Sequence, residues 1–237
     1  MSPRILFALW FAVSPLSMTD ALAETGVDYN KIFEDALAAV DFDFHQTWAY
    51  TETHVDAEHV WVGRSDPRRP ARERWQLISV DARAPTEAEI KKYRKEKAHQ
   101  HSDDGEHSVA AIVEPGSIRL IEETDEYWLL GFSPDDEEDI MDNVDATIRI
   151  NKADRRLEYI DLRNHEIIKP AFGVKISKLI TRLTFAPAAD GGPVVPASTQ
   201  VEATGRAYIV VTFDEQEVTR NSDFEDVAAD LKMVPDR

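Results

Sequence analysis

IRLIEETDEYWLLGF, residues 118–132, is the most informative segment of the chain for its fold. Residues 118–123 and 127–132 are rich in the apolar and aromatic side chains typical of β-strands, and the polar turn Thr124-Asp125-Glu126 separates them. A turn this short predicts a hairpin of two antiparallel strands. The segment therefore indicates an antiparallel sheet rather than a doubly wound parallel one.

The alternating pattern continues on the C-terminal side of this hairpin. Five more runs follow, at residues 146–150, 157–163, 174–185, 199–213 and 216–224. Turn-forming residues lie between several of them, as in Asn151-Lys152-Ala153-Asp154. Ser133-Pro134-Asp135-Asp136 predicts a helix start, because Ser caps, Pro fits the first turn and carboxylates favour the positive end of the helix dipole.

Three strands and two helices are predicted on the N-terminal side. Residues 42–51, 60–63 and 74–80 alternate as strands, with Phe42, Phe44, Gln46, Trp48 and Tyr50 on one face of the first. Asp28 can cap a helix whose apolar residues recur every three or four positions, namely Tyr29, Ile32, Phe33, Ala36, Leu37 and Val40.

The second helix, at residues 86–98, begins with the capping-box spacing of Thr86 and Glu89. Only Ile90, Tyr93 and Ala98 offer apolar surface on it, so we expect an inserted helix that lies on the protein surface. Residues 100–107 are expected to form a loop.

These elements predict an α+β fold that is mainly β. About ten strands and two or three helices follow one another without strand-helix-strand alternation. No linker divides the chain, so residues 24–237 are expected to form one domain.

Residues 1–23 are typical of a cleaved signal peptide. Arg4 precedes an apolar run at residues 5–13, and Ala21-Leu22-Ala23 supplies the cleavage pattern. The alternative, an uncleaved membrane anchor, needs an apolar run of about 20 residues, which this segment lacks. The sequence therefore predicts export.

Composition excludes several classes of function. The chain has 45 Asp and Glu against 27 Lys and Arg, a formal net charge of -18, which disfavours binding to nucleic acid. It has no cysteine, which excludes disulfides and a thiolate nucleophile.

The order of one amphipathic helix, three strands, an inserted helix and a long antiparallel meander resembles the periplasmic lipoprotein-carrier superfamily, the LolA-like half-barrel. The phrases RWQLISVDARAPT at residues 74–86 and PAFGVKI at residues 170–176 are also similar to those of exported bacterial proteins without an assigned activity. The resemblance implies a curved sheet whose concave face binds acyl chains under helices, in the periplasm. It implies no catalytic residue and no cofactor.

A concave apolar face must be filled by side chains or by a ligand. Seven residues are candidates for lining it, namely Phe33, Leu37, Trp48, Trp75, Tyr127, Phe185 and Arg206. Core packing is the alternative for each apolar member, and a solvated position is the alternative for Arg206.

Other chemistry has weaker signals. His99, His101 and His107 are of a type that binds metals, yet their spacing matches no structural zinc pattern. The acidic run at residues 135–145 lacks the order of an EF-hand loop. No Gly-x-Ser-x-Gly motif is present, and we do not expect an enzyme.

Two functions follow as expectations. The first is a periplasmic protein, without a transmembrane segment in its mature chain, that binds a lipid, a lipoprotein acyl chain or another apolar ligand; full secretion is the alternative location. The second is an envelope sensor or scaffold of the same fold without a ligand, which contacts a protein partner through the helix at residues 86–98.

Overall fold

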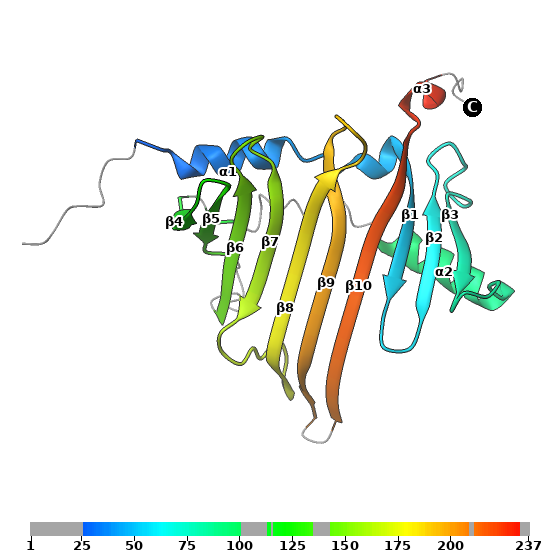
Figure 1. Ribbon diagram of the computed structural model, residues 1–237. Coiled ribbons are helices and arrows are strands. Elements are labelled where there is room, and N and C mark those ends of the chain that lie inside the picture. Colours follow the sequence, from blue (N-terminus) through cyan, green and yellow to red (C-terminus); the bar gives the residue numbers. More distant parts are fainter. Residues whose placement is uncertain (1–25, 101–112, 115, 135–142, 209–210, 233–237) are drawn as a thin grey trace, which may run out of the picture.

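The computed structural model describes residues 26–100, 113–114, 116–134, 143–208 and 211–232. Within these ranges the chain forms a single ten-stranded antiparallel sheet in the order β3-β2-β1-β10-β9-β8-β7-β6-β5-β4 (Figure 1). The strands are β1 (Trp48–Val55), β2 (Val60–Ser65), β3 (Trp75–Val80), β4 (Arg119–Glu123), β5 (Tyr127–Phe132), β6 (Val144–Asn151), β7 (Leu157–Asn164), β8 (Val174–Pro187), β9 (Val194–Ala207) and β10 (Val211–Asp226). The helices are α1 (Tyr29–Ala38), α2 (Glu87–Gln100), the short α3 (Ala228–Leu231) and the 3-10 helix η1 (Phe44–Gln46).

The sheet consists almost entirely of hairpins between consecutive strands. The exception is β10, which returns to pair with β1 and so joins the first three strands to the last seven. Strands β3 and β4 end the sheet without pairing to each other, so it curves without closing. The predicted mainly-β, antiparallel half-barrel is therefore confirmed.

Both core clusters lie on the same face of the sheet. Residues paired across antiparallel strands project to one side, and one such row crosses nine strands. It runs Leu130, Ile148, Ile160, Leu183, Thr199, Thr219, His54, Trp61 and Val80. We call this side the inner face, because both α1 and α2 pack against it.

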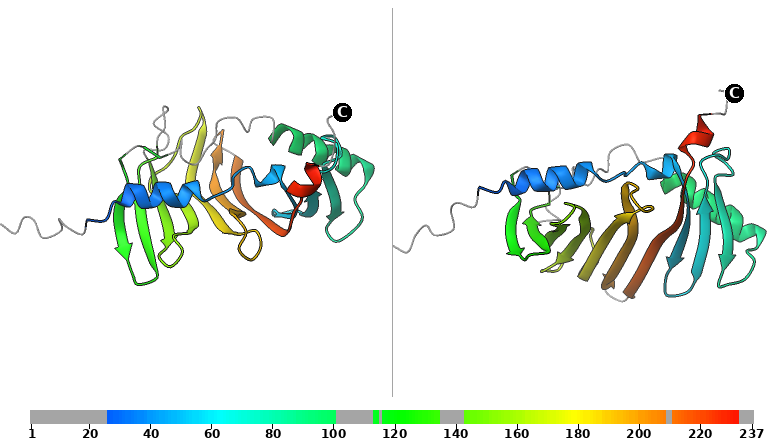
Figure 2. Two further views of the ribbon diagram at one scale, coloured as in Figure 1. Left: turned by 90° about the horizontal axis from the view of Figure 1, so that it is seen from above. Right: turned by 45° about the horizontal axis from the view of Figure 1, so that its top comes forward.

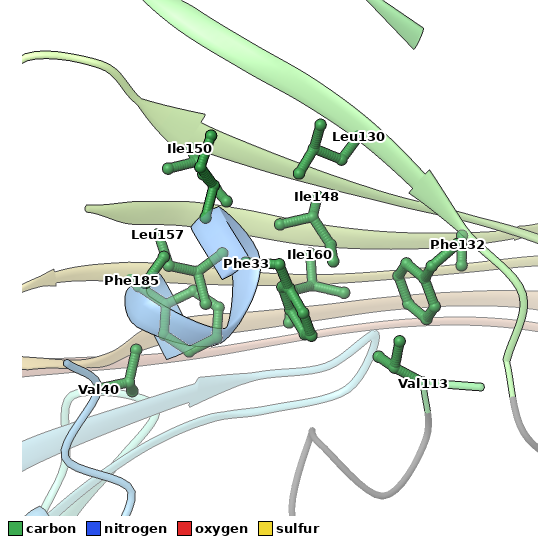
Figure 3. Packing of buried hydrophobic residues seen from close by; sticks show 13 residues of the cluster. Phe33, Val40, Val113, Leu130, Phe132, Ile148, Ile150, Leu157, Ile160 and Phe185 are labelled. Atoms are coloured by element: carbon green, nitrogen blue, oxygen red, sulfur yellow. The ribbon is translucent and has the colours of Figure 1, made fainter. Parts of the chain in front are cut away.

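Helix α1 covers the β5–β7 end of the inner face. Asp28 caps it by accepting a hydrogen bond from the Lys31 backbone amide (3.1 Å). Its buried residues Ile32, Phe33 and Ala36 belong to the cluster built around the fully buried side chains of β5, β6 and β7. Figure 3 shows Phe33 directed toward Ile148 and Ile160. The predicted amphipathic helix is therefore confirmed.

Helix α2 covers the other end of the inner face, over β1–β3 (Figure 2). The capping box forms: the Glu89 amide donates to Thr86 Oγ1 (3.3 Å), and the Glu89 carboxylate accepts from the Thr86 amide (2.7 Å). The helix is more than a surface insertion, however, because Tyr93 is 6% exposed and belongs to the second core cluster. One aromatic side chain and half-buried Ile90 thus anchor an otherwise charged helix.

The start of α2 is expected to depend on pH. The hydrogen bond from Arg83, followed by those from Thr86, lowers the pKa of Glu89 to about 2 from its ordinary 4.5. Because the folded pKa is the lower one, Glu89 stabilises this turn fully above about pH 4.5 and loses that effect as the pH falls toward 2. The protection factors of the first-turn amides of α2 in hydrogen exchange, corrected for the intrinsic rate at each pH, should fall across this window. In Glu89→Gln these protection factors should be lower already at neutral pH and lose most of this pH dependence, whereas Glu87→Gln should behave like the parent chain.

Two predicted elements were wrong in detail. Residues 44–46 form η1 rather than strand, because the Gln46 and Thr47 amides donate to carbonyls three residues back, and β1 begins only at Trp48. The last hairpin turns after Ala207, not after residue 213, and its strands pair in continuous register. Tyr208 has φ 52° there, a conformation that its residue type does not signal.

Some expectations fall on residues outside the described ranges. They are the signal peptide at residues 1–23, nearly all of the loop at residues 100–107 and most of the helix predicted to begin at Ser133. Among the helices that the structure describes, none combines the length and the apolar character needed to cross a membrane.

Candidate functional site: the inner face of the sheet

The inner face is filled with large side chains at both of its ends. Under α1, buried leucine, isoleucine and phenylalanine side chains form one cluster. Under α2, the second cluster is mainly aromatic, and Tyr50 contacts Phe44, Trp75 and Phe224 at ring-centroid distances of 4.9 to 5.9 Å. Packed side chains therefore fill most of the inner face beneath the two helices.

The side chains between these ends are smaller and half-buried. We define the central strip as the inner-face residues of β8 and β9 between the two clusters: Leu179, Thr181, Thr199, Val201 and Ala203. Each is partly exposed, although β8 and β9 are the two middle strands of the ten-stranded sheet, where core burial would be expected. The strip offers an apolar surface of small residues on which an extended ligand could lie.

Acidic residues border the central strip on β10. Glu217 pairs with Val201 and Glu215 with Ala203, so both carboxylates lie on the inner face, and both residues are exposed. Phe213 continues the same row and packs over Gly205, where a Cβ would collide with the Phe213 ring and with the Lys175 carbonyl oxygen. The Phe213 ring and the Lys175 backbone therefore approach Gly205 closely.

Five of the seven candidate lining residues pack the two ends of the inner face. Phe33 and Phe185 are 5% exposed within the α1 cluster, and Leu37 is half-buried beside it. Trp48 and Trp75 are 8% and 5% exposed within the α2 cluster. Their side chains flank the central strip instead of forming its surface.

The other two candidates lie elsewhere. Tyr127 precedes Trp128, which packs in the α1 cluster, so Tyr127 is on the outer face. Its hydroxyl donates to Glu122 (2.8 Å), which raises its pKa, and Arg149 lies 4.0 Å from its ring centroid. Arg206 is exposed and points to the side opposite Gly205. Neither residue contributes to the inner-face site.

The histidines considered as metal ligands cannot be placed as a group. His99 lies at the end of α2, where side chains are not described, and His101 and His107 lie outside the described ranges. Within those ranges no three His, Asp or Glu side chains are arranged to hold a metal ion.

A polar pocket under α2 was missed in the sequence. It measures about 240 Å³, and Glu52, His54, Trp61, Tyr93 and Lys97 help to line it. Glu52 and Lys97 form an ion pair (2.6 Å) whose side chains are only 9% and 12% exposed. The signal was present, because Glu52 continues the inner-facing alternation of Trp48 and Tyr50.

Comparisons with known proteins add one likeness of fold. No family model and no curated protein matches the chain. A LolA superfamily protein from Nitrosomonas europaea has a similar solved structure, with a TM-score of 0.40 and 12% sequence identity, covering 84% of this chain and 93% of that one.

Proposed function

We propose that the mature chain is an exported binding protein that holds an apolar ligand, a lipid or a lipoprotein acyl chain, against the central strip. One observation supports this above others: the inner face carries bulky packed side chains at both ends and small, partly exposed ones between them. Burying apolar surface on a ligand is worth about 25 cal/mol per Å², so an acyl chain laid on this strip would bind favourably. The N-terminal leader supports a periplasmic location.

Paired substitutions on β9 test the proposal. Val201→Lys places a positive charge on the inner face, where the carboxylate of its cross-strand neighbour Glu217 can pair with it. Gln200→Lys makes a similar change on the outer face, where Glu202 is near (3.0 Å). A fluorescent fatty acid titrated into residues 24–237 should bind at least about tenfold more weakly to Val201→Lys, because a buried charge opposes apolar contact. Gln200→Lys should bind like the parent chain.

A second variant separates loss of ligand binding from loss of folding. Ala203→Phe keeps the strip apolar but fills it, so fatty-acid binding should fall while the urea midpoint and circular dichroism stay close to those of the parent chain. If native mass spectrometry of periplasmic protein shows only the bare chain, and fatty acid binds all variants equally or none, the proposal is wrong.

The scaffold alternative stays a prediction. It assigned partner contact to α2, whose Tyr93 and Lys97 side chains instead hold it to the sheet. Several of its outward residues are exposed, but no contact among the described residues favours this function over ligand binding.

A further inference from the structure

A second, larger pocket lies at the other side of α2. Its volume is about 750 Å³, and it is formed by η1, the segment before β3 and the C-terminal half of α2. Its charged lining residues are Arg72, Arg74, Arg94, Lys95 and Lys97. Residues 72 and 95 come from segments that only the packing of α2 against β3 brings together. This pocket is separate from the central strip.

The pocket is basic in a strongly acidic protein. Its described lining includes five cations and no carboxylate, whereas acids outnumber bases 45 to 27 in the whole chain. The carboxylates of Asp66, Glu225 and Asp230 near this end are engaged by Arg68. Arg72, Arg94 and Lys95 have no ion-pair partner in the described part of the chain, and a bound anion would relieve the repulsion among them.

Three of the cations are held in place by the fold. Arg94 Nε donates to the Trp75 carbonyl oxygen (3.4 Å), which leaves its terminal nitrogens for another acceptor. Arg74 donates to the His45 carbonyl oxygen, and Lys97 pairs with Glu52. The Arg94 guanidinium group, positioned through its backbone contact, suits the two-point recognition of an oxyanion.

The remaining two cations lie at the exposed rim. Arg72 and Lys95 are both exposed, and neither has an ion-pair partner in the described part of the chain. Exposed cations beside the positioned Arg94 guanidinium group form the arrangement expected for an anion that enters from solvent.

We propose that this pocket binds a phosphate group. A phosphate oxyanion accepts several charge-assisted hydrogen bonds at once, and the pocket, which Trp75 helps to line, is large enough to hold part of the molecule that carries it. Such a phosphate group can belong to two kinds of ligand, a free phosphate or the head group of an anionic phospholipid. The site does not depend on ligand binding at the central strip.

The test compares two variants with the same change in net charge. Arg72→Gln/Lys95→Gln removes the two rim cations, and Lys169→Gln/Arg220→Gln removes two exposed cations away from the pocket. Inorganic phosphate is titrated calorimetrically into residues 24–237 at constant ionic strength, because surface electrostatics are screened by salt. Flotation with phosphatidylglycerol vesicles, and with phosphatidylcholine vesicles as the neutral control, provides the second probe.

The expected result is phosphate affinity at least about tenfold lower in the rim variant and unchanged in the control variant. Failure to bind phosphate, together with phosphatidylglycerol binding that only the rim variant loses, would support the lipid head group as the source. Equal loss in both variants, or no binding to either probe, would overturn the proposal. Fatty-acid binding measured on the same rim variant should stay unchanged, which separates failure here from failure at the central strip.

Discussion

Lys97→Met is expected to lower the free energy of unfolding by about 3–5 kcal/mol. The substitution leaves the Glu52 carboxyl group beneath α2, with a side chain only 9% exposed, without its partner at 2.6 Å. It also removes the ammonium group that lies 5.1 Å from the Trp75 ring centroid and 5.8 Å from that of Tyr93. Urea unfolding of residues 24–237, followed by circular dichroism, measures the loss.

Two further variants make the result specific to the buried pair. Glu52→Leu/Lys97→Met should recover most of the loss, because replacing both charges removes the uncompensated carboxylate. Lys92→Met, one turn away, should cost less than about 1 kcal/mol, since the Lys92–Glu96 pair is exposed and 3.8 Å apart. A Lys97→Met chain that unfolds at the parent's urea concentration would contradict the assignment of Glu52 and Lys97 as a buried pair.

Tyr93→Ala is expected to cost about 3–5 kcal/mol, the typical loss for truncating a buried aromatic side chain. Tyr93 is 6% exposed and packs edge-on against Trp75 at a ring-centroid distance of 6.5 Å. Its hydroxyl is buried without a hydrogen-bond partner among the described residues, and burial raises its pKa. Tyr93→Phe should therefore leave stability unchanged or increase it, because the unsatisfied group is removed and the ring stays.

A substitution at Gly63 in β2 tests the position of the Tyr93 ring from the side of the sheet. A Cβ at Gly63 would collide with the Tyr93 hydroxyl, so Gly63→Ala should cost about 1–3 kcal/mol by forcing the ring aside. In a Tyr93→Ala background the same substitution should cost almost nothing. Equal costs in both backgrounds, measured by urea unfolding, would show that the ring does not lie over Gly63.

Local patterns predicted the elements well where each pattern was self-contained. The Asp28 cap, the Thr86–Glu89 capping box and the hairpin at residues 118–132 depend on residues within a few positions of each other. The prediction failed where the backbone turned without a signal residue, as at Tyr208, or where tertiary contacts overrode alternation, as at Phe44. Phe44 lies in the 3-10 helix η1 and not in a strand, yet it belongs to the aromatic cluster, because its ring contacts Tyr50 and Phe224.

The aromatic residues chosen for a ligand site show why the site was harder to predict than the fold. Alternation identifies which side chains point inward, and Trp48 and Trp75 do so. It does not say what then covers them: Trp75 packs against Tyr93 of α2, and Trp48 packs against Phe224. The small residues Val201 and Ala203 carried no signal of their own, because only their position between two covered ends makes them exposed.

The sequence alone determined the antiparallel class, the order of the elements and the two helix starts, because hydrophobic period and capping act between near neighbours. The tertiary structure decided the pairing of β10 with β1, the Glu52–Lys97 pair under α2 and the basic pocket that joins Arg72 to Lys95. These features join residues that are far apart in the chain, and their positions follow from how the curved sheet and its helices pack. No short-range pattern specifies such contacts, since their free energy exists only once the sheet has formed.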